Sequence, residues 1–184
     1  MDVTFVTSNP GKVVEVRRVF ADFGIRVRWS RRELPEPQSD RLEEVVRAKL
    51  AATARPHVGV VVEDSGIFLP GLGGFPGVYS RYVYDTIGLP GVLRLAEGRS
   101  RNAQFRAVAG YRRGRTELLA IGTVEGTLAR RPRGENGFGY DPIFIPNGDR
   151  RTFGEMTPAE KDGLSHRGRA MRTLARKLQK TRGE

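Results

Sequence analysis

The feature that most constrains the fold of this chain is the run at residues 60–66, in which three valines precede Glu63, Asp64, Ser65 and Gly66. A short apolar run of β-branched residues predicts a buried strand, which we expect over residues 57–62. Open α/β sheets place their chemistry at the carboxyl ends of such strands. The run therefore predicts a sheet with a strand that ends on two carboxylates able to bind or react.

The length of 184 residues suits one domain, or one domain with a small lobe, and allows a substantial core. The chain has no apolar run of about twenty residues that could span a membrane. Its start lacks the basic segment of a signal peptide, so we expect none. The absence of cysteine excludes disulfides and thiolate chemistry. Together these features predict a single domain over residues 1–184, located in the cytoplasm.

The net charge of +11 is the one unusual bulk property. It would favour attraction to polyanions, either nucleic acid or a triphosphate. The alternative is compositional drift, because only five of the 32 basic residues are lysines and the other 27 are arginines. The arginines are scattered and form no single stripe, so charge alone does not predict a nucleic-acid-binding protein.

The pattern of apolar residues and caps predicts alternating strands and helices. Besides 57–62, strands are expected at 3–7, 26–29, 103–112, 116–127 and 142–145, the pair 103–112 and 116–127 forming a hairpin near Gly114. Helices are expected at 10–23, from 42 through 50, at about 89–96, from 158 and from 166 to the end, and residues 70–81 are expected to form a loop. This order predicts an α/β or α+β domain with a mixed sheet.

The helix from 158 is expected to start with a capping box of Thr157 and Glu160. One face of the helix from 42 and the buried stripe of the last helix are predicted from apolar spacing; they comprise Leu42, Val45, Val46, Lys49 and Leu50, and Met171, Leu174, Ala175 and Leu178.

The segment at residues 7–12 follows the first strand and opens the first helix. Asn9 is expected to cap that helix, with Pro10 in its first turn. Backbone N–H groups at a helix N-terminus attract phosphate, and Lys12 adds a positive charge. The segment is not a Walker A loop, because Val6 and Val13 stand where that motif requires Gly and Ser or Thr. The alternative is a plain turn between strand and helix.

Glu63 and Asp64 point to opposite faces if the strand continues through them. One of them could bind a metal or polarise water while the other faces another layer. Magnesium prefers carboxylate oxygens, waters and substrate phosphates, and Glu36 could add a second ligand from a loop. The alternative is a solvated strand end.

The glycines on both sides of Phe138 suggest an exposed ring that could stack on a base. The alternative for Phe138 is a core anchor of a turn. Tyr140 is favoured as a packing residue, and Asp141 could accept hydrogen bonds from a purine edge.

Lys161, His166 and Arg167 stand close together in the sequence, near the start of the last helix. Their donors would suit the acceptors of a 6-oxo purine, although a lone histidine at a helix start is more often a surface or capping residue. No His, Cys and Asp set has zinc spacing, and Ser65 lacks the context of a nucleophile elbow.

Four segments, taken in order, resemble the Ham1 family of inosine triphosphate pyrophosphatases, also called XTP/dITP diphosphatases. They are Thr-Ser-Asn-Pro-Gly-Lys at 7–12, Glu-Asp-Ser-Gly at 63–66 with Gly-Gly-Phe-Pro-Gly-Val-Tyr-Ser at 73–80, Gly-Phe-Gly-Tyr-Asp-Pro at 137–142, and Ser-His-Arg at 165–167. The resemblance extends from residue 4 to about 175. Each motif is weak by itself, whereas four in this order at the family's spacing are highly specific.

The resemblance implies an elongated mixed β-sheet with flanking helices, two lobes that enclose a central nucleotide cleft, and a homodimer. It implies Mg²⁺-dependent hydrolysis of ITP, dITP and XTP to the monophosphate and pyrophosphate, which removes deaminated purines from the nucleotide pool. One departure is Pro37, which stands where the family usually has an aliphatic residue. This puts the geometry of the loop around Glu36 in question, but not the activity.

The resemblance also assigns roles to individual residues. The triphosphate would be held by Thr7, Ser8, Asn9, Pro10, Gly11 and Lys12. Mg²⁺ would be bound by Glu36 and Asp64, and Asp64 would also accept the proton of the attacking water. Ser65, Phe138, Gly139, Tyr140 and Asp141 would contact the substrate, Phe138 by stacking on the base, and Lys161, His166 and Arg167 would read its 6-oxo edge.

Two other functions fit parts of the sequence. A non-catalytic nucleic-acid-binding protein would use the charge and the loop around Phe138, although Glu63 and Asp64 would repel phosphates unless a metal intervened. A diphosphatase for another unusual nucleotide would share the reaction and differ only in its substrate. A Nudix hydrolase is disfavoured, because no predicted helix carries that family's cluster of glutamates.

Overall fold

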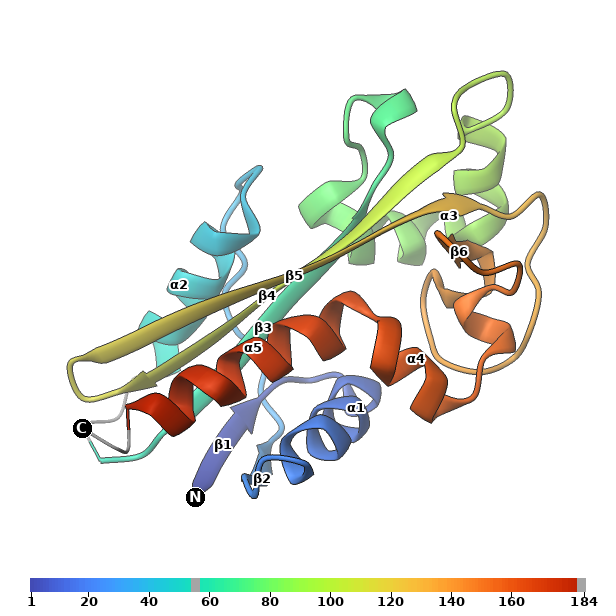
Figure 1. Cartoon of the computed structure of the whole chain (residues 1–184). Helices are drawn as coiled ribbons and strands as arrows, with labels where there is room; N and C mark the ends of the chain where they lie inside the picture. The colour runs from blue at the N-terminus through green and yellow to red at the C-terminus, as the bar shows by residue number, and fades with distance from the viewer. Residues whose placement is uncertain (54–56, 182–184) are drawn as a thin grey trace. The chain divides into compact units, whose positions relative to one another are not determined.

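The protein has a mixed α/β fold in the computed structural model, which describes residues 1–53 and 57–181 (Figure 1). Its strands are β1 (Asp2–Val6), β2 (Arg26–Ser30), β3 (Val60–Phe68), β4 (Asn102–Arg113), β5 (Thr116–Leu128) and β6 (Phe144–Pro146). Its α-helices are α1 (Pro10–Ala21), α2 (Leu42–Thr53), α3 (Ser80–Leu95), α4 (Pro158–Leu164) and α5 (His166–Lys180).

The strands form one sheet in the order β2-β1-β3-β4-β5-β6. Strand β1 pairs in parallel with β2 and β3, while β5 pairs antiparallel with β6. Strands β4 and β5 are joined by residues 114–115 alone, so they run antiparallel, and Gly114 has the positive φ of 56° that such a short turn requires. The predicted mixed sheet and the predicted hairpin are therefore confirmed.

The chain divides into two compact units, and β3, β4 and β5 contribute residues to both. The first unit comprises Met1–Asp64, Ala107–Gly122 and His166–Glu184, and the second comprises Ser65–Arg106 and Thr123–Ser165. Each unit has its own cluster of buried hydrophobic residues. The single domain over residues 1–184 and the cleft between two lobes stay predictions.

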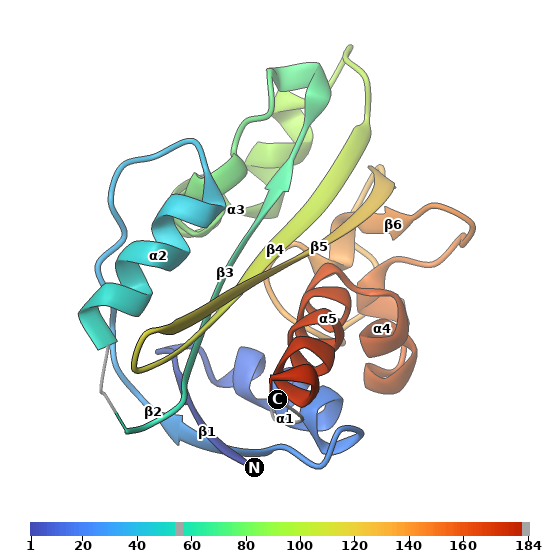
Figure 2. The same ribbon diagram turned by 60° about the vertical axis from the view of Figure 1, so that its left-hand side comes forward.

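The first unit has helices on both faces of its part of the sheet. Helix α2 lies on one side of the strands, while α1 and α5 lie side by side on the other (Figure 2). The predicted buried stripe of α5 is confirmed, as Met171, Leu174 and Leu178 are almost fully buried. Helix α2 packs closely on β4, where a Cβ on Gly110 would lie 2.6 Å from a Val46 methyl carbon. The sheet is therefore covered on both faces, which is why β3 reads as a continuous apolar run.

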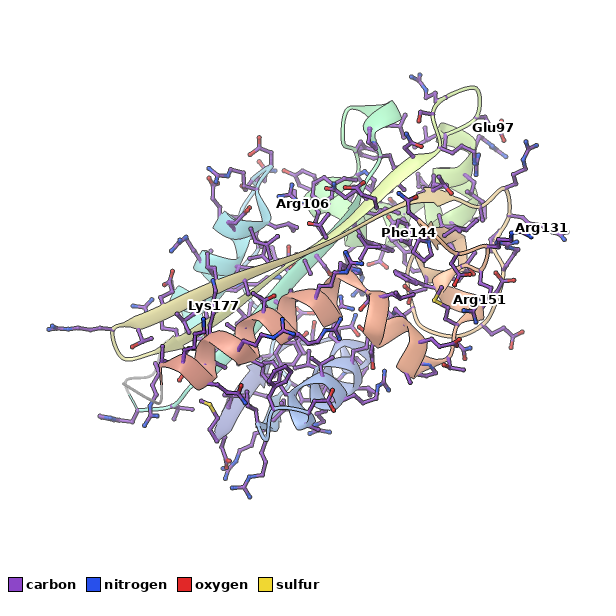
Figure 3. All side chains as sticks on the ribbon, in the orientation of Figure 1. Glu97, Arg106, Arg131, Phe144, Arg151 and Lys177 are labelled. Carbon is purple, nitrogen blue, oxygen red and sulfur yellow. The ribbon has the colours of Figure 1, made fainter. Side chains whose placement is uncertain are left out.

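The second unit is built around aromatic packing. The ring of Phe144 lies 4.6 Å from that of Phe105 and 5.1 Å from that of Phe153, between ring centroids (Figure 3). Both pairs of rings are tilted relative to each other and do not lie face to face, as aromatic side chains favour. Phe144 and Phe153 are completely buried, so they form the centre of this core.

Helix α3 is longer than the sequence predicted. The predicted helix at 89–96 corresponds only to its second part, which follows a kink at Gly88 (φ 61°, ψ −174°). The first part starts at Ser80, so the loop predicted over 70–81 ends earlier, and it contains 3₁₀ turns at Pro70–Leu72 and Gly77–Tyr79. The first part was missed because Val83 is its only buried apolar residue, which leaves no helical stripe to detect.

Four predicted strands match the structure to within one residue at each end, and two differ by more. Strand β3 starts at Val60 and continues to Phe68, so Glu63 and Asp64 lie within the strand and not at its end. Gly66 does not end the strand; it allows the backbone of Gly77 to approach closely. Strand β6 starts at Phe144 because the residues around Pro142 form a 3₁₀ turn.

Two helix boundaries can be compared with their predicted signals. Helix α1 ends at Ala21, earlier than predicted, and a turn leads from there to Gly24, which has a φ of 63°. The capping box predicted for α4 is confirmed, with Thr157 and Glu160 bonded reciprocally.

Within residues 1–53 and 57–181, none of the helices combines the length and the apolar character needed to cross a membrane. The predicted cytoplasmic location stays a prediction.

The close approach at Gly66 makes a prediction for stability. A Cβ at this position would lie 2.0 Å from the carbonyl oxygen of Gly77 and 2.9 Å from Ser80 Oγ. We expect Gly66→Ala to lower the free energy of unfolding by about 1–3 kcal/mol, because the backbone must shift to make room. The measurement is urea unfolding followed by circular dichroism.

The matched control for this substitution is Gly163→Ala in α4, where a Cβ would meet nothing within 4 Å. Alanine is the better helix former, so the control should be neutral or more stable by up to about 1 kcal/mol. Equal effects of the two substitutions would contradict the explanation by steric crowding.

Candidate active site

The segment at residues 7–12 is held by local hydrogen bonds. Asn9 Oδ1 accepts from the backbone N–H groups of Gly11 (2.9 Å) and Lys12 (3.3 Å), so the predicted N-cap is confirmed. Thr7 Oγ1 accepts from the backbone N–H of Asn9 (3.1 Å). The segment therefore holds the start of α1, and with it the side chain of Lys12, in a fixed position beside β3.

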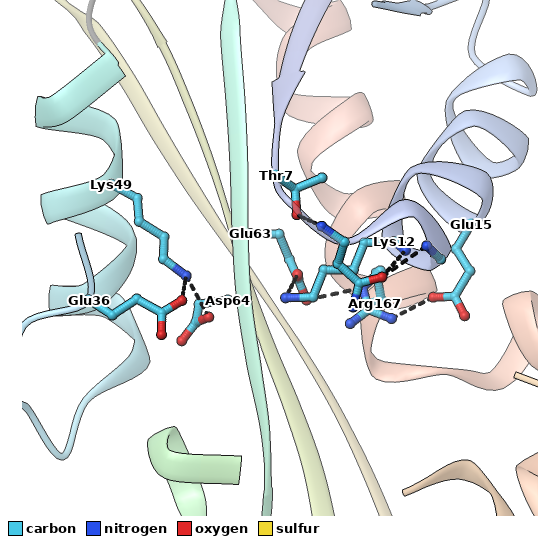
Figure 4. A network of polar contacts seen from close by, with 10 residues as sticks. Thr7, Lys12, Glu15, Glu36, Lys49, Glu63, Asp64 and Arg167 are labelled. Atoms are coloured by element: carbon cyan, nitrogen blue, oxygen red, sulfur yellow. Dashed lines mark hydrogen bonds and ion pairs between the residues drawn. The ribbon is translucent and has the colours of Figure 1, made fainter. Parts of the chain in front are cut away.

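Lys12 belongs to a buried network of two cations and two carboxylates (Figure 4). Lys12 Nζ lies 2.7 Å from Glu63 Oε2, and Arg167 Nε donates to Glu63 Oε1 at 3.1 Å. Arg167 Nη1 donates to Glu15 Oε2 at 2.5 Å. The charges of these four side chains balance, as buried ions require.

Glu63 is held in its charged form by this network. Burial by itself would raise the pKa of Glu63, but the positive charges of Arg167 and Lys12 outweigh it and lower the pKa to about 2. Glu63 is thus a permanent anion that fixes both cations, and it is unsuited to accept a proton during a reaction.

Asp64 points to the other side of β3, as alternation along an uninterrupted strand requires (Figure 4). There Lys49 Nζ donates to Asp64 Oδ1 at 2.8 Å and to Glu36 Oε1 at 2.7 Å. Lys49 comes from α2, and Glu36 comes from the segment before that helix. The two adjacent carboxylates of the motif therefore have separate partners on opposite faces of the sheet.

The environment of Asp64 differs from that of Glu63. Burial raises the pKa of Asp64 and outweighs the opposite effect of the Lys49 and Lys12 ammonium groups. Burial would lower the pKa of Lys49, but Asp64 and Glu36 raise it, so Lys49 stays charged. A carboxylate with a raised pKa is the better proton acceptor, which favours Asp64 over Glu63 as a general base.

The oxygens of Glu36 and Asp64 converge on one point, which the Lys49 ammonium occupies. Among the described residues, no group of three or more His, Cys, Asp or Glu side chains could hold a metal ion. Mg²⁺ is commonly bound by only one or two carboxylates, with waters and substrate phosphates completing its shell. The two convergent carboxylates therefore fit Mg²⁺ bound together with a nucleotide, and not a metal enclosed by protein alone.

A second cluster lies in the second unit and joins Phe138, Asp141 and Lys161. Asp141 Oδ2 accepts from Lys161 Nζ (2.6 Å) and from the backbone N–H of Phe138 (2.7 Å). The Lys161 ammonium also lies 4.8 Å from the centroid of the Phe138 ring. The ring is half-buried, and not exposed as the sequence predicted, because Lys161 covers part of it.

The loop that carries Phe138 depends on Gly137. This residue has a φ of 79°, and a Cβ there would lie 2.1 Å from Asp141 Oδ2. A side chain at this position would therefore disrupt the carboxylate that holds both Lys161 and the loop. Tyr140 is buried, and its hydroxyl donates to the carbonyl oxygen of Ser80 at 2.7 Å, which supports the packing interpretation.

The predicted group of Lys161, His166 and Arg167 falls into two places. Lys161 is paired with Asp141 in the second unit, while Arg167 belongs to the network around Glu63 in the first. His166 is buried at the start of α5, so the alternative of a surface histidine is wrong. His166 also makes a small contribution to lowering the pKa of Glu63.

Two residues of these networks were missed by sequence reasoning. Lys49 was predicted only as part of the apolar face of α2, and Glu15 was not singled out. A lysine within an apolar stripe is itself a signal, because lysine is almost never fully buried unless it is paired. Glu15 gave no comparable signal, because its partner Arg167 lies far away in the sequence.

Comparison with known proteins identifies relatives along nearly the whole chain. The Ham1 family model matches residues 3–177. A dITP/XTP pyrophosphatase from Thermococcus kodakarensis is 49% identical over 95% of this chain and 96% of its own length, and one from Pyrococcus horikoshii is 46% identical over 95% of each. The structure of a HAM1 protein from Coxiella burnetii superposes with a TM-score of 0.81 at 29% identity, covering 97% of this chain and 99% of that one.

The buried position of Glu63 makes a pH-dependent prediction. Its pKa is about 2 in the folded protein, against 4.5 for an unperturbed glutamate. Its charge therefore stabilises the fold above pH 4.5, and this contribution is lost as the pH falls from 4.5 toward 2. We expect Glu63→Gln to cost about 3–5 kcal/mol at neutral pH, because it leaves Arg167 and Lys12 without their counter-charge.

The measurement is the free energy of unfolding of wild type and variant between pH 7 and pH 3, where the difference between them should shrink. Glu117→Gln is the control, since Glu117 forms a surface pair with Arg47 and its loss should cost at most about 1 kcal/mol. A difference for Glu63→Gln that is the same at every pH would contradict the assignment of Glu63 as a buried anion.

Proposed function

This chain belongs to the Ham1 family, and we propose that it hydrolyses non-canonical purine nucleoside triphosphates, namely dITP, ITP and XTP. The α–β phosphoanhydride is cleaved, and the products are the nucleoside monophosphate and pyrophosphate. The relatives named dITP/XTP pyrophosphatase support this substrate class. The structural observation that carries the proposal is the convergence of the Glu36 and Asp64 carboxylates on one cationic point, across β3 from the network of Lys12 and Glu63.

Apart from Ser65, the proposed residues of the reaction centre belong to the first unit. Glu36 and Asp64 would hold Mg²⁺, which when bound neutralises charge on the phosphate oxygens and makes the anhydride more electrophilic. Asp64 accepts the proton of the attacking water, for which its raised pKa suits it. The segment of residues 7–12 binds the triphosphate, with Lys12 held ready by Glu63. Ser65, which follows Asp64 on β3, contacts the substrate.

The nucleoside is bound by the loop that holds Phe138. Phe138 stacks on the base, which leaves its other face to the Lys161 ammonium. Gly139, Tyr140 and Asp141 complete the loop, in which Asp141 orients Lys161. Lys161 donates to the 6-oxo group of the purine. The contacts of His166 and Arg167 with that group stay a prediction, because these two residues belong to the first unit.

This arrangement explains how adenine is rejected. Hypoxanthine and xanthine carry a 6-oxo acceptor, whereas adenine presents an amino donor that would leave buried donors of the protein unpaired. Sites that require such a hydrogen bond reject the wrong group by about 10⁴-fold or more. Guanine shares the 6-oxo group, so a separate device must exclude its 2-amino group.

The first test is pyrophosphate release from ITP, XTP, GTP and ATP, with Mg²⁺ and with EDTA. We expect Mg²⁺-dependent release from ITP and XTP and little from ATP or GTP. Asp64→Asn should lower kcat by at least about 100-fold, because it removes the proton acceptor and a metal ligand. The control is Asp2→Asn, which changes a surface ion pair with Arg26 and should leave kcat as in the wild type.

Absence of release from all four nucleotides would refute the proposed function. Tight, salt-dependent binding of oligonucleotides in that case would favour a nucleic-acid-binding protein. If an unusual pyrimidine triphosphate is tested as well and is the only substrate that yields pyrophosphate, the protein would be a diphosphatase for another unusual nucleotide.

A second test concerns the reading of the base. Lys161→Met should lower the ratio of kcat/KM for ITP over ATP by at least about tenfold, because the donor to the 6-oxo group is lost. Phe138→Ala is the matched control, since stacking does not distinguish the bases. It should lower kcat/KM for ITP and for ATP alike, by a factor that corresponds to about 1–3 kcal/mol of lost stacking free energy. An unchanged ratio in Lys161→Met would mean that another residue reads the 6-oxo group.

We also propose that the protein forms a homodimer through exposed apolar side chains of residues 75–87. Tyr82 is 69% exposed, and Phe75, Tyr79 and Ile87 are each more than 40% exposed. Such a concentration of exposed aromatic residues is typical of an interaction surface. Tyr82→Glu should shift the mass measured by light scattering from dimer to monomer, while Ile121→Glu on β5 should not. A dimeric Tyr82→Glu protein would place the interface elsewhere.

A further inference from the structure

Lys49 stands at the point where the two proposed metal ligands meet. Its ammonium group lies 2.7 Å from Glu36 Oε1 and 2.8 Å from Asp64 Oδ1, so both carboxylates are already bound to a cation (Figure 4). Lys49 and Asp64 are buried, whereas the Glu36 side chain is 60% exposed. The lysine is fixed by a regular helix, and Glu36 belongs to a segment without regular structure.

We propose that Lys49 is an internal cation that holds the two carboxylates together in the absence of metal and competes with the divalent ion for them. This inference rests on the proposed function, which assigns Glu36 and Asp64 to the metal. It makes Lys49 a positioning residue that sets how strongly the site binds metal before a nucleotide arrives.

The need for such a cation follows from the charges. Two carboxylates converging in a partly buried site repel each other, and a buried Asp64 without a counter-charge is strongly unfavourable. The Lys49 ammonium balances Asp64 and also draws Glu36 toward it. Glu36 lies outside the helices and strands of the described residues, so the contact with Lys49 is what holds its side chain at the site.

The same position creates competition. A divalent ion coordinated by these oxygens cannot share them with an ammonium group at hydrogen-bond distance, and the two cations repel each other. Lys49 must therefore move before the ion is fully coordinated. A triphosphate would offer new acceptors for the displaced ammonium, so the ion should bind more weakly alone than together with a nucleotide.

The first test measures the affinity of MnCl₂ alone by calorimetry, without nucleotide. We expect Lys49→Met to bind Mn²⁺ roughly tenfold more tightly than the wild type, because the competing charge is gone. Lys49→Arg keeps the charge and should stay within about threefold of the wild type. Lys177→Met is the control for loss of a lysine elsewhere. The ammonium group of Lys177 on α5 (Figure 3) donates to the carbonyl oxygen of Leu119, whereas the lysine that contacts Glu36 and Asp64 is Lys49.

The second test uses the wild-type protein and does not depend on the folding of a variant. The chain has only five lysines, so their ammonium signals can be resolved by NMR after ¹⁵N-lysine labelling. Lys49 should give a protected ammonium signal without metal, and MgCl₂ should shift or remove it while the signal of Lys177 is unchanged. The inference would be overturned if the Lys49 signal were unchanged in saturating MgCl₂. It would also be overturned if a folded Lys49→Met protein bound Mn²⁺ as weakly as the wild type or more weakly.

Failure of this inference can be told from failure of the proposed function. If the wild type releases pyrophosphate from ITP with Mg²⁺ but Lys49 does not respond to the ion, the function stands and the competition is refuted. If Mg²⁺ displaces Lys49 but no nucleotide is hydrolysed, the competition stands and the function is refuted.

Discussion

The constraint on which the site depends is that β3 continues without a break through two adjacent carboxylates. Alternation along the strand sends Glu63 to one face of the sheet and Asp64 to the other. Both faces are covered by helices, so neither carboxylate can rely on bulk water for its charge. Each face must therefore supply its own cations: Lys12 and Arg167 for Glu63, and Lys49 for Asp64. The alternation of side chains along β3 thus places Glu63 and Asp64 in two different environments, in which they have different roles.

The two tasks follow from how far each charge is balanced. Glu63 has two cationic partners, and its pKa falls to about 2, so it holds Lys12 and Arg167 and does not exchange protons at neutral pH. Asp64 has one hydrogen-bonded lysine, Lys49, whose charge lowers its pKa less than burial raises it, so the pKa of Asp64 is raised. Buried ion pairs of this kind contribute little net stability compared with apolar packing, but breaking one is costly. Their presence in β3 is better explained by the site than by the fold.

Much of the fold could be predicted because its signals are local. The cap at Asn9, the capping box of Thr157 and Glu160 and the apolar stripe of α5 depend on residues within a few positions of one another. The continuation of β3 could not be predicted, because Ser65 and Gly66 resemble a strand end unless the approach of Gly77 is known. The partners within the site could not be predicted either, because they are far apart in the sequence. Arg167 meets Glu63 across more than a hundred residues, and no pattern in the sequence encodes that meeting.

The lysines show how such a site can favour a densely charged substrate. Three of them are already paired with carboxylates: Lys12 with Glu63, Lys49 with Asp64, and Lys161 with Asp141. A ligand that recruits one of these ammonium groups must compete with a carboxylate that is already in place. A neutral nucleoside has no group that can do so, whereas a triphosphate offers several anionic oxygens and brings a divalent ion as well. Because each ammonium group already has a carboxylate partner before binding, the exchange is favourable only when the ligand supplies both the anion and the cation. If the proposed function holds, the paired lysines would thus select for the metal complex of a triphosphate before the base is read.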